Sequence, residues 1–483
     1  MTFPEFWRRE WVTPVPKVSE PKVLKDIRKI ASTSDYSKVF EKFIMEWVIE
    51  DMGVKLGLQQ FAGKKGIGTE HMIVALIDRV KFLLDKYPDH SAIIASGIDW
   101  SSSFDRVDPT LATLNLINLG IRSSLIPILI DFITDRKMTV KFNQAESTLY
   151  TLIGGGPQGS QIGQNQYLAA SYDNATSVNE EDQFKYCDDL EILDLVLLGN
   201  ILQEYDFRQH VASDIGIGQL YLPAEKYAMQ QNINSISKWT QDNLMQINEL
   251  KSYYLVFTRT KQEFATRLTI NNKFLERLNV AKVLGVWISE DGSWTRNTKE
   301  ILKKGYSRIG FLSKMRYAGV NIDDLLELYQ LFIRSCTEYC SVAFHSSLTE
   351  SESKSLERLQ STCLKVILQE DYVSYSDALK MTGLQTLYDR REERCLNFSL
   401  KSIKHTQNSR FFPLNHNLQN NDPKCGKPLW RENFVVNYAR TADYQNSAIP
   451  YCQRMLNFHF KDKPLPKNIK SKIKLPEETN NSF

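Results

Sequence analysis

The apolar residues of this chain form runs of two kinds, and each kind predicts a different element. Residues 92–98 are all small or apolar, which is the pattern of a strand buried on both faces. Two more apolar runs lie on either side of Asp188 and Asp189, which predicts a hairpin whose tip carries both carboxylates. Residues 36–52 and 71–87 instead predict helices. The first half of the chain is therefore expected to combine strands with helices.

From about residue 291 onward the pattern predicts mostly helices, including residues 323–340 and 351–368. An apolar stripe at helical spacing begins this region and consists of Leu302, Tyr306, Ile309 and Leu312. Basic residues surround the stripe: Lys299, Lys303, Lys304, Arg308, Lys314 and Arg316. Such a helix can lie on a nucleic-acid duplex, or it can be an ordinary amphipathic helix with a solvated face.

Composition agrees with a globular protein but does not indicate its function. The 483 residues suffice for a large core, and 42% hydrophobic with 24% charged residues is ordinary. A net charge of +3 is too small to indicate nucleic-acid binding. Seven cysteines without a Cys-x-x-Cys pair fit a reducing compartment, and Cys425, Cys452 and His459 are spaced too loosely for a zinc knuckle. We expect no membrane span, because no apolar run is long enough.

The candidate chemistry lies in three aspartates. Asp99 directly follows the predicted buried strand, so pairing of that strand with the hairpin would bring its carboxylate to those of Asp188 and Asp189. Carboxylates that close repel one another unless a cation lies between them. Oxygen ligands of this kind suit Mg²⁺ bound together with phosphates, and two such ions roughly 4 Å apart serve nucleotidyl transfer. Alternatively, an Asp-Asp pair is only a turn or a helix start.

The aspartates belong to an ordered set of motifs, and in these the chain resembles the reverse transcriptases of retrotransposons without long terminal repeats. The resemblance is to the LINE type, especially jockey-like animal elements, and covers almost the whole chain. Seven blocks occur in family order: KVFEKFI at 38–44, QFAGKKGIGTEH at 60–71, IDWSSSFD at 98–105, GPQGS at 156–160, YCDD at 186–189, WTQDNLMQINELK at 239–251 and LGVW at 284–287.

The resemblance implies an α+β fold of the right-hand polymerase type, with fingers, a palm that contains an antiparallel sheet, and a thumb. We expect fingers over residues 1–90 and the palm with interleaved fingers, the reverse transcriptase domain, over 91–290. A helical thumb and connection follow over 291–400, and a C-terminal region over 401–483. The last region ends in a basic tail that we expect to be disordered.

The resemblance also implies roles for residues of the palm. Asp99 and Asp188 are expected to bind two Mg²⁺ ions, for which Mn²⁺ can substitute, with Asp189 supporting them. Phe104 matches the bulky aromatic that presses where a ribonucleotide's 2′-hydroxyl would lie, and so favours dNTPs. Its alternative is an ordinary core phenylalanine. Lys251 matches a candidate general acid for pyrophosphate departure, or it is an exposed surface lysine.

Other residues are expected around the incoming nucleotide. In the family, Gln158 and Gly159 help to form the floor of the nucleotide pocket and precede a helix whose N-terminus faces it. Positive charge from the finger motifs is expected to meet triphosphate or template backbone, and the sequence does not decide among Arg28, Lys64 and Lys65. The polar run over residues 160–166 departs from the family's usual apolar stretch.

Together these matches imply an RNA-directed DNA polymerase that acts on an RNA template, a DNA primer or target DNA, and dNTPs, with nuclear localisation expected from the family. Only about 90 residues precede Asp99, so we expect the family's endonuclease to be absent from this chain, and the chain to be a fragment or a truncated copy of the element's second reading frame. Two alternatives remain. A viral RNA-dependent RNA polymerase shares the carboxylates, but Phe104 argues against it. An inactive or co-opted nucleic-acid-binding relic is compatible with the polar run over residues 160–166.

Overall fold

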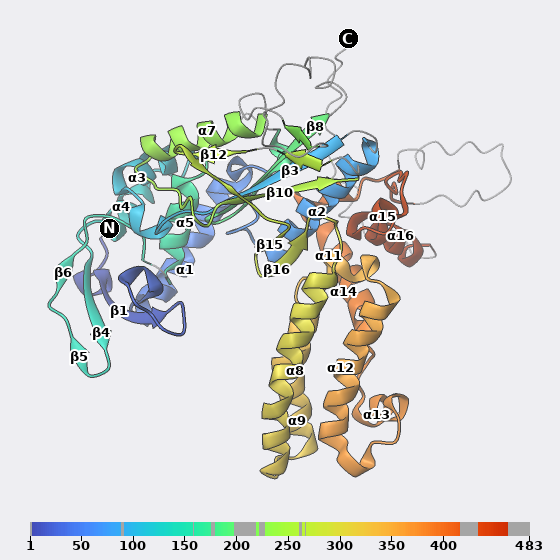
Figure 1. Ribbon diagram of the computed structural model, residues 1–483. Coiled ribbons are helices and arrows are strands. Elements are labelled where there is room, and N and C mark those ends of the chain that lie inside the picture. The colour runs from blue at the N-terminus through green and yellow to red at the C-terminus, as the bar shows by residue number, and fades with distance from the viewer. Residues whose placement is uncertain are drawn as a thin grey trace, which may run out of the picture. The chain divides into compact units, whose positions relative to one another are not determined.

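The computed structural model describes residues 2–87, 91–157, 159–174, 179–197, 219–221, 228–259, 263–265, 267–415 and 433–461. Contacts within the chain divide it into two units. Unit 1 comprises Met1–Ile67, Ala92–Val256 and Thr260–Leu278, and unit 2 comprises Gly68–Ser91, Phe257–Arg259 and Asn279–Phe483. Strands concentrate in unit 1 and helices in unit 2 (Figure 1), which confirms the predicted α+β class.

Unit 1 is organised around a five-stranded sheet with the strand order β14-β10-β3-β8-β7. Its strands are β3 (Ser91–Ile98), β7 (Gln183–Tyr186), β8 (Asp189–Leu197), β10 (Tyr253–Thr258) and β14 (Glu276–Arg277). Every residue of the central strand β3 is buried, as its apolar sequence predicts. Strands β7 and β8 pair antiparallel with Tyr186 opposite Asp189, which confirms the predicted hairpin.

The core of this sheet is closed by helix α7 (Ala228–Asp242), whose apolar stripe supplies Met229, Ile233 and Ile236. These side chains pack in one cluster with Ile94 of β3 and Ile192 of β8. All five side chains are completely buried. The packing therefore holds the two strands that carry the aspartates at a fixed spacing.

A second sheet of unit 1 has the order β2-β1-β4-β5, and β6 also pairs with β4. Its strands are β1 (Arg9–Pro16), β2 (Ile27–Ser32), β4 (Lys137–Phe142), β5 (Ala145–Glu146) and β6 (Tyr150–Thr151). Strand β1 runs antiparallel to β2 and parallel to β4. Short two-stranded pairs complete the strands of the unit: β9 (Gln219–Tyr221) with β11 (Glu263–Ala265), and β12 (Thr269–Ile270) with β13 (Lys273–Phe274).

Four helices of unit 1 share a further core: α1 (Asp35–Met52), α3 (Pro109–Asn118), α4 (Ile126–Ile133) and α5 (Gln161–Ala170). Helix α1 matches the predicted helix over residues 36–52. Asp108 caps the start of helix α3, because its carboxylate accepts hydrogen bonds from the first-turn amides of Thr110 and Leu111. Pro109 occupies the first helical position, where no backbone N–H is needed. Such local signals explain the helix start without reference to the rest of the fold.

Unit 2 begins with α2 (Thr69–Lys86), which matches the predicted helix over residues 71–87, and continues with the hairpin β15 (Val280–Val283) and β16 (Val286–Ser289). The remaining helices are α8 (Thr295–Tyr317), α9 (Ile322–Leu328), a π-helix (Tyr329–Arg334), α10 (Ser335–Glu338), α11 (Ser341–Phe344), α12 (Glu350–Leu368), α13 (Tyr375–Thr382), α14 (Leu387–Ser402), α15 (Ala442–Gln445) and α16 (Ala448–His459). The helical runs predicted over residues 323–340 and 351–368 are thus confirmed.

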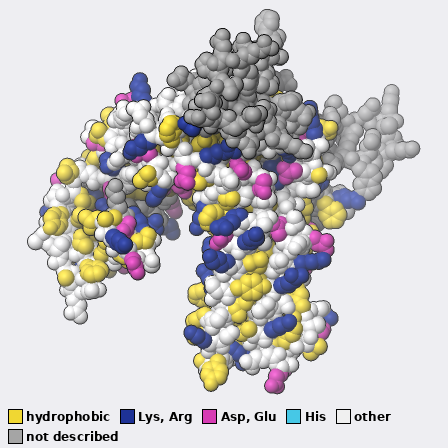
Figure 2. Space-filling model, viewed as in Figure 1, with side chains coloured by type: hydrophobic (Ala, Val, Ile, Leu, Met, Phe, Trp, Pro, Cys, Tyr) yellow, Lys and Arg dark blue, Asp and Glu magenta, His cyan; other side chains and the backbone are white. Residues whose placement is uncertain are grey.

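Helix α8 carries the predicted apolar stripe. Leu302, Ile309 and Leu312 pack into the core of unit 2, whereas Tyr306 remains 45% exposed. On the visible face, basic side chains gather over α8 with apolar side chains between them (Figure 2). The exposed aromatic residues of this helix are Tyr306, Phe311 and Tyr317. The stripe is therefore a core contact, and a separate set of aromatic and basic side chains faces outward.

The domain boundaries expected at residues 90, 290 and 400 remain predictions. The basic tail after Lys461 lies outside the described residues. Within the part of the chain that the structure describes, no helix combines the length and apolar character needed to cross a bilayer.

Candidate active site

The three aspartates lie at the ends of strands in the five-stranded sheet of unit 1. Asp99 directly follows β3, Asp189 is the first residue of β8, and Asp188 lies in the two-residue turn between β7 and β8. Strands β3 and β8 are neighbours in this sheet. The hydroxyl of Ser103, four residues beyond Asp99, donates a hydrogen bond of 3.2 Å to Asp188 Oδ2. The Asp99 segment therefore contacts the hairpin turn directly.

The hairpin turn has an unusual backbone. Cys187 adopts φ 55°, in the left-handed region that non-glycine residues seldom occupy. Its Sγ accepts a hydrogen bond from Gln164 Nε2 of α5 at 3.5 Å, and burial raises the pKa of the thiol to about 11. The thiol is therefore protonated at neutral pH and adds no negative charge. The tight turn leaves Asp188 at the tip of the hairpin.

Asp99 is held by the segment that precedes β10. Its carbonyl oxygen accepts from the Asn248 amide at 2.8 Å, and its own amide donates to Ser252 Oγ at 3.1 Å. The Asn248 side chain donates to Asp99 Oδ2 at 3.1 Å. Lys251 places its ammonium 3.8 Å from the same oxygen, although its side chain is 66% exposed. The motif over residues 239–251 is thus brought to the first aspartate.

Electrostatics confirm that the three carboxylates share one environment. The pKa of Asp189 is raised to about 6, first by burial and then by the negative charges of Asp188 and Asp99. Burial also raises the pKa of Asp99, with Lys251 and Asn248 opposing the shift and Asp188 adding to it. The raised pKa values of Asp99 and Asp189 thus come mainly from burial, and the repulsion among the carboxylates adds to them.

Among the described residues, no three His, Cys, Asp or Glu side chains are arranged closely enough to hold one metal ion together. Like-charged carboxylates favour separated rotamers when no cation lies between them. The donor set nevertheless fits a divalent ion, because it consists of carboxylate oxygens with uncompensated charge. Asp99, Asp188 and Asp189 are the residues that would hold it.

Phe104 lies in a short 3-10 helix (Ser103–Arg106) beside these carboxylates. Its ring stacks on Tyr167 of α5 with ring centroids 4.9 Å apart and planes 25° apart. Tyr167 is 1% exposed, and its hydroxyl pKa is raised well above its usual value by burial and then by Asp188. Phe104 is only half-buried, so it supports the core and still presents part of its ring outside it.

The glycine-rich loop packs against the backbone of Phe104. Gly156 N–H donates to the Phe104 carbonyl at 2.8 Å, and Gly155 N–H donates to the Val107 carbonyl at 2.9 Å. Gly155 has φ +87°, and a Cβ there would lie 3.0 Å from the Asp105 carbonyl oxygen. Only glycine permits this approach. Gln158 lies outside the described residues.

A pocket of about 510 Å³, open to solvent, adjoins this loop. The loop residues 154–157 line it together with Lys29 of β2 and Asp105, which form an ion pair at 2.8 Å. Neighbouring strand residues face opposite sides, so Arg28 lies on the other face of β2 from Lys29. Sequence reasoning named Arg28 and missed Lys29, because the pattern of β2 does not reveal which face meets the loop.

The other expected finger residues have different surroundings. Lys64 donates from its ammonium to the Gly57 carbonyl at 2.6 Å and so holds its own loop, while Lys65 is exposed. Gly159 has φ +121°, and a Cβ there would lie 2.9 Å from the Ala31 carbonyl oxygen of β2. Lys17 was not predicted, yet its positive charge lowers the pKa of Asp99. The proposed contacts of Lys64 and Lys65 with substrate stay predictions.

The polar run after the glycine-rich loop forms the first turns of α5. Asn165 and Gln166 are buried, and neither polar atom of the Gln166 amide has a hydrogen-bond partner among the described residues. Burying an amide without partners costs free energy. The departure from the family pattern noted in the sequence is therefore also a departure in packing.

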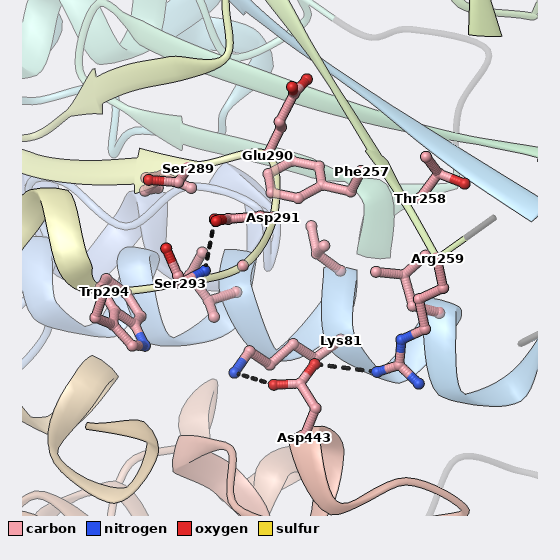
Figure 3. Close-up of a pocket in the computed structure, with 15 residues that line it drawn as sticks. Lys81, Phe257, Thr258, Arg259, Ser289, Glu290, Asp291, Ser293, Trp294 and Asp443 are labelled. Carbon is pink, nitrogen blue, oxygen red and sulfur yellow. Dashed lines mark hydrogen bonds and ion pairs between the residues drawn. The ribbon is translucent and has the colours of Figure 1, made fainter. Parts of the chain in front are cut away.

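A second pocket, of about 490 Å³, belongs to unit 2 and is lined by parts of α2 and β16, the loop that precedes α8, residues 257–259 and Asp443. Figure 3 shows Lys81 and Arg259 converging on one carboxylate, Asp443, at 2.8 and 3.0 Å. The two positive charges of its lining are thus paired with a carboxylate of the same pocket. For this reason we assign the candidate active site to the carboxylates of unit 1.

Comparisons with known proteins place these observations in context. No protein-family model matches the chain. The chain is 20% identical over 320 residues to the probable RNA-directed DNA polymerase from transposon BS of Drosophila melanogaster, a match that covers 64% of this chain and 32% of that protein. The chain therefore spans about a third of the length of this curated relative.

Solved structures show weaker likenesses. A telomerase from Candida tropicalis in complex with a telomeric RNA fragment has a TM-score of 0.42 at 10% identity, over 97% of this chain and 64% of that one. The RNA-dependent RNA polymerase of a human picobirnavirus has a TM-score of 0.36 at 9% identity, over 80% of this chain and 64% of that one. Both TM-scores are too low to support a conclusion about this chain. The transposon match agrees with the motifs found in the sequence, and the chain is distantly similar to this transposon polymerase.

Proposed function

We propose that this chain is an RNA-directed DNA polymerase, which extends a DNA primer or target DNA end with dNTPs on an RNA template. The observation that carries the proposal is the shared environment of Asp99, Asp188 and Asp189, where burial and mutual repulsion leave negative charge uncompensated. The transposon polymerase to which the chain is similar supports this choice of reaction.

The family relationship implies divalent metal ions, and we propose two Mg²⁺, replaceable by Mn²⁺, held by Asp99 and Asp188 with Asp189 in support. Bound ions of this kind neutralise phosphate charge and lower the pKa of an attacking hydroxyl. Asn248 orients the Asp99 carboxylate through its 3.1 Å hydrogen bond. Ser103 does the same for Asp188.

Two further side chains act on the substrate in this proposal. Lys251 is mostly exposed beside Asp99, where its ammonium can donate a proton to departing pyrophosphate. Phe104 occupies the position from which its ring would exclude a 2′-hydroxyl, and its stacking on Tyr167 fixes the ring plane. Gln158 and Gly159, with Arg28, Lys64 and Lys65, remain proposed contacts of the nucleotide or template.

The outward face of α8 is proposed to contact the template–primer duplex. Its exposed aromatic side chains are flanked by the exposed lysines Lys299, Lys303, Lys304 and Lys314. Positive charge binds phosphate without regard to sequence, and aromatic rings add apolar contact with sugars or bases.

One observation favours a second candidate, a relic of such an element that binds nucleic acid without turnover. The buried Gln166 amide of α5 is without hydrogen-bond partners among the described residues, close in sequence to the glycine-rich loop. Loosened packing at this helix would reduce turnover while leaving the carboxylates intact.

Primer extension on an RNA template with dNTPs and Mg²⁺ tests the proposal, with Asp188→Ala compared with wild type. We expect extension by wild type, none by Asp188→Ala, and normal extension by Asp242→Ala, which changes an exposed aspartate of α7. Equal incorporation by wild type and Asp188→Ala would remove the proposed site. Binding of dNTP without any extension by wild type would favour the relic.

A further inference from the structure

Glu41 of α1 is completely buried, although it is a carboxylate in the middle of an amphipathic helix. It belongs to the KVFEKFI block at residues 38–44, whose apolar members explain the helix but not this acid. Buried carboxylates normally need several hydrogen bonds or a cation. The hydrogen-bond partners of Glu41 therefore indicate its role.

The Glu41 carboxylate contacts the start of α5. Its Oε2 accepts from Ser160 Oγ at 2.6 Å and from the amides of Gln161 and Ile162 at 3.0 and 3.4 Å. Its Oε1 accepts from Ser37 Oγ at 3.0 Å. The first-turn amides of α5 carry the positive end of the helix dipole, so they suit a negative charge. The N-terminus of α5 is thus tied to α1.

Helix α5 is also the support of Phe104. Tyr167, near its C-terminal end, stacks on the Phe104 ring, and the loop that enters the helix donates a backbone hydrogen bond from Gly156 to the Phe104 carbonyl at 2.8 Å. Any shift of α5 along or about its axis therefore moves both contacts of Phe104 together. Glu41 fixes that helix at its other end.

We propose that Glu41 is a positioning residue for sugar selection, acting through α5 on Phe104. This inference rests on the proposed polymerase function. Ser160 is the coupling group, since its hydroxyl donates to Glu41 and accepts from the Gly163 amide at 3.1 Å. Glu41 touches neither substrate nor the aspartates in this scheme, and it acts only by holding the helix that carries Tyr167.

The test compares Glu41→Gln with Glu46→Gln, which changes an exposed acid of the same helix. Single-turnover incorporation of dNTP and NTP gives the ratio of their kcat/KM values. Hydrogen bonds to a neutral amide oxygen are weaker than those to a carboxylate, so we expect Glu41→Gln to lower the dNTP preference about tenfold. Glu46→Gln should leave the preference unchanged. An equal loss for dNTP and NTP in Glu41→Gln would show a merely structural role and overturn the inference.

A double variant identifies the route of the effect. Once Phe104→Ala has removed the ring, Glu41→Gln should change the dNTP preference no further, because Glu41 is proposed to act only through the position of that ring. Additive effects of the two substitutions would contradict coupling through Phe104.

Amide hydrogen exchange provides a readout independent of polymerase activity. Glu41→Gln should speed hydrogen exchange of the Gln161 and Ile162 amides about tenfold, because a neutral amide oxygen accepts their hydrogen bonds more weakly than the carboxylate does. Glu46→Gln is the control. Unchanged exchange would overturn the inference even in an active enzyme. If wild type incorporates no nucleotide, the proposed function fails, and the exchange result still decides whether Glu41 holds α5.

Discussion

The polar face of α2 in unit 2 and the carboxylate end of the sheet in unit 1 both bury charged side chains, with different surroundings. On α2, Lys81 is 3% exposed and its ammonium meets Asp443 Oδ1 at 2.8 Å and Ser347 Oγ at 3.3 Å. Asp85 on the same helix accepts from the Thr441 amide at 2.7 Å and from the Thr441 hydroxyl at 2.6 Å. Each of these charges is satisfied within its own unit.

At the carboxylate end of the sheet in unit 1, the aspartates have neighbours of the same sign. Asp189 is surrounded by Asp188 and Asp99, and its pKa rises to about 6, first through burial and then through these charges. A buried charge with matched partners contributes to folding, whereas a set of like charges opposes it and persists where function requires a ligand. The contrast therefore separates charges that the fold satisfies from the carboxylates that we propose as the catalytic site.

Asp188→Asn tests the functional half of this contrast and should have the largest effect. Loss of one metal-binding carboxylate should lower dNTP incorporation by on the order of a thousandfold or more, since metal ions supply several kcal/mol of transition-state stabilisation. Removal of a like charge should leave the free energy of unfolding unchanged or raise it. Single-turnover kinetics and urea denaturation measure the two quantities. A variant with a lower free energy of unfolding and normal turnover would show that Asp188 has a structural role and not a catalytic one.

Asp78 of α2 is the exception in unit 2, because burial raises its pKa to about 7 despite the opposing charges of Arg79 and Lys81. Below pH 4 this carboxyl is protonated in both the folded and the unfolded chain, and the folded state keeps its full stability. As pH rises from 4 through 7, the unfolded chain loses the proton first, so the free energy of unfolding falls. Asp78→Asn should therefore match wild type near pH 4 and exceed it at pH 8 by up to roughly 4 kcal/mol, at about 1.4 kcal/mol per pKa unit.

Urea denaturation of wild type and Asp78→Asn across this pH range measures the difference, with Glu393→Gln as an exposed control on α14. Stability curves that run parallel from pH 4 to pH 8 would show that Asp78 carries no such linkage.

Phe104→Ala tests whether the apolar neighbour of the carboxylates selects the sugar. Removal of a steric barrier should raise NTP incorporation relative to dNTP by about 10- to 100-fold, the range that pocket shape usually provides. Competition between labelled dNTP and NTP in primer extension measures the change. Phe274→Ala, which alters a 68% exposed ring, is the matched control. An unchanged sugar preference would return Phe104 to a purely structural role.

Asp443→Ala tests the structural half of the contrast and should have the smallest effect on turnover. The variant leaves the buried Lys81 ammonium without its carboxylate and with only Ser347 Oγ as a partner among the described residues, so we expect the free energy of unfolding to fall by about 3 kcal/mol. Extension per folded molecule should not change. A loss of turnover at unchanged stability would contradict the division of charges between the units.

The sequence sufficed for elements whose signals are local. Strand β3 and the hairpin that carries Asp188 followed from apolar runs, and α1 and α2 from periodicity. The family motifs then named Asp99 and Asp189 as their partners. Roles that depend on contacts between distant segments were not visible: Glu41 and Ser160 are 119 residues apart, and no pattern in either segment indicates their hydrogen bond.

The finger residues show a second reason. A motif indicates a basic residue but not the face of the strand on which it lies. The sequence indicated Arg28, and in the structure Lys29 lines the pocket beside Asp105. Lys64 donates to the Gly57 carbonyl, and its contact with substrate stays a prediction. Long basic side chains have several acceptors within reach, and only the fold decides among them.

The count of Mn²⁺ ions bound in the presence of dNTP, measured by electron paramagnetic resonance, tests the central claim most directly. The account predicts two ions for wild type and for Asp443→Ala, and none at matched concentration for a variant that combines Asp99→Asn with Asp188→Asn. Equal numbers of bound ions in wild type and in this double variant would contradict the assignment of the carboxylates as the metal site.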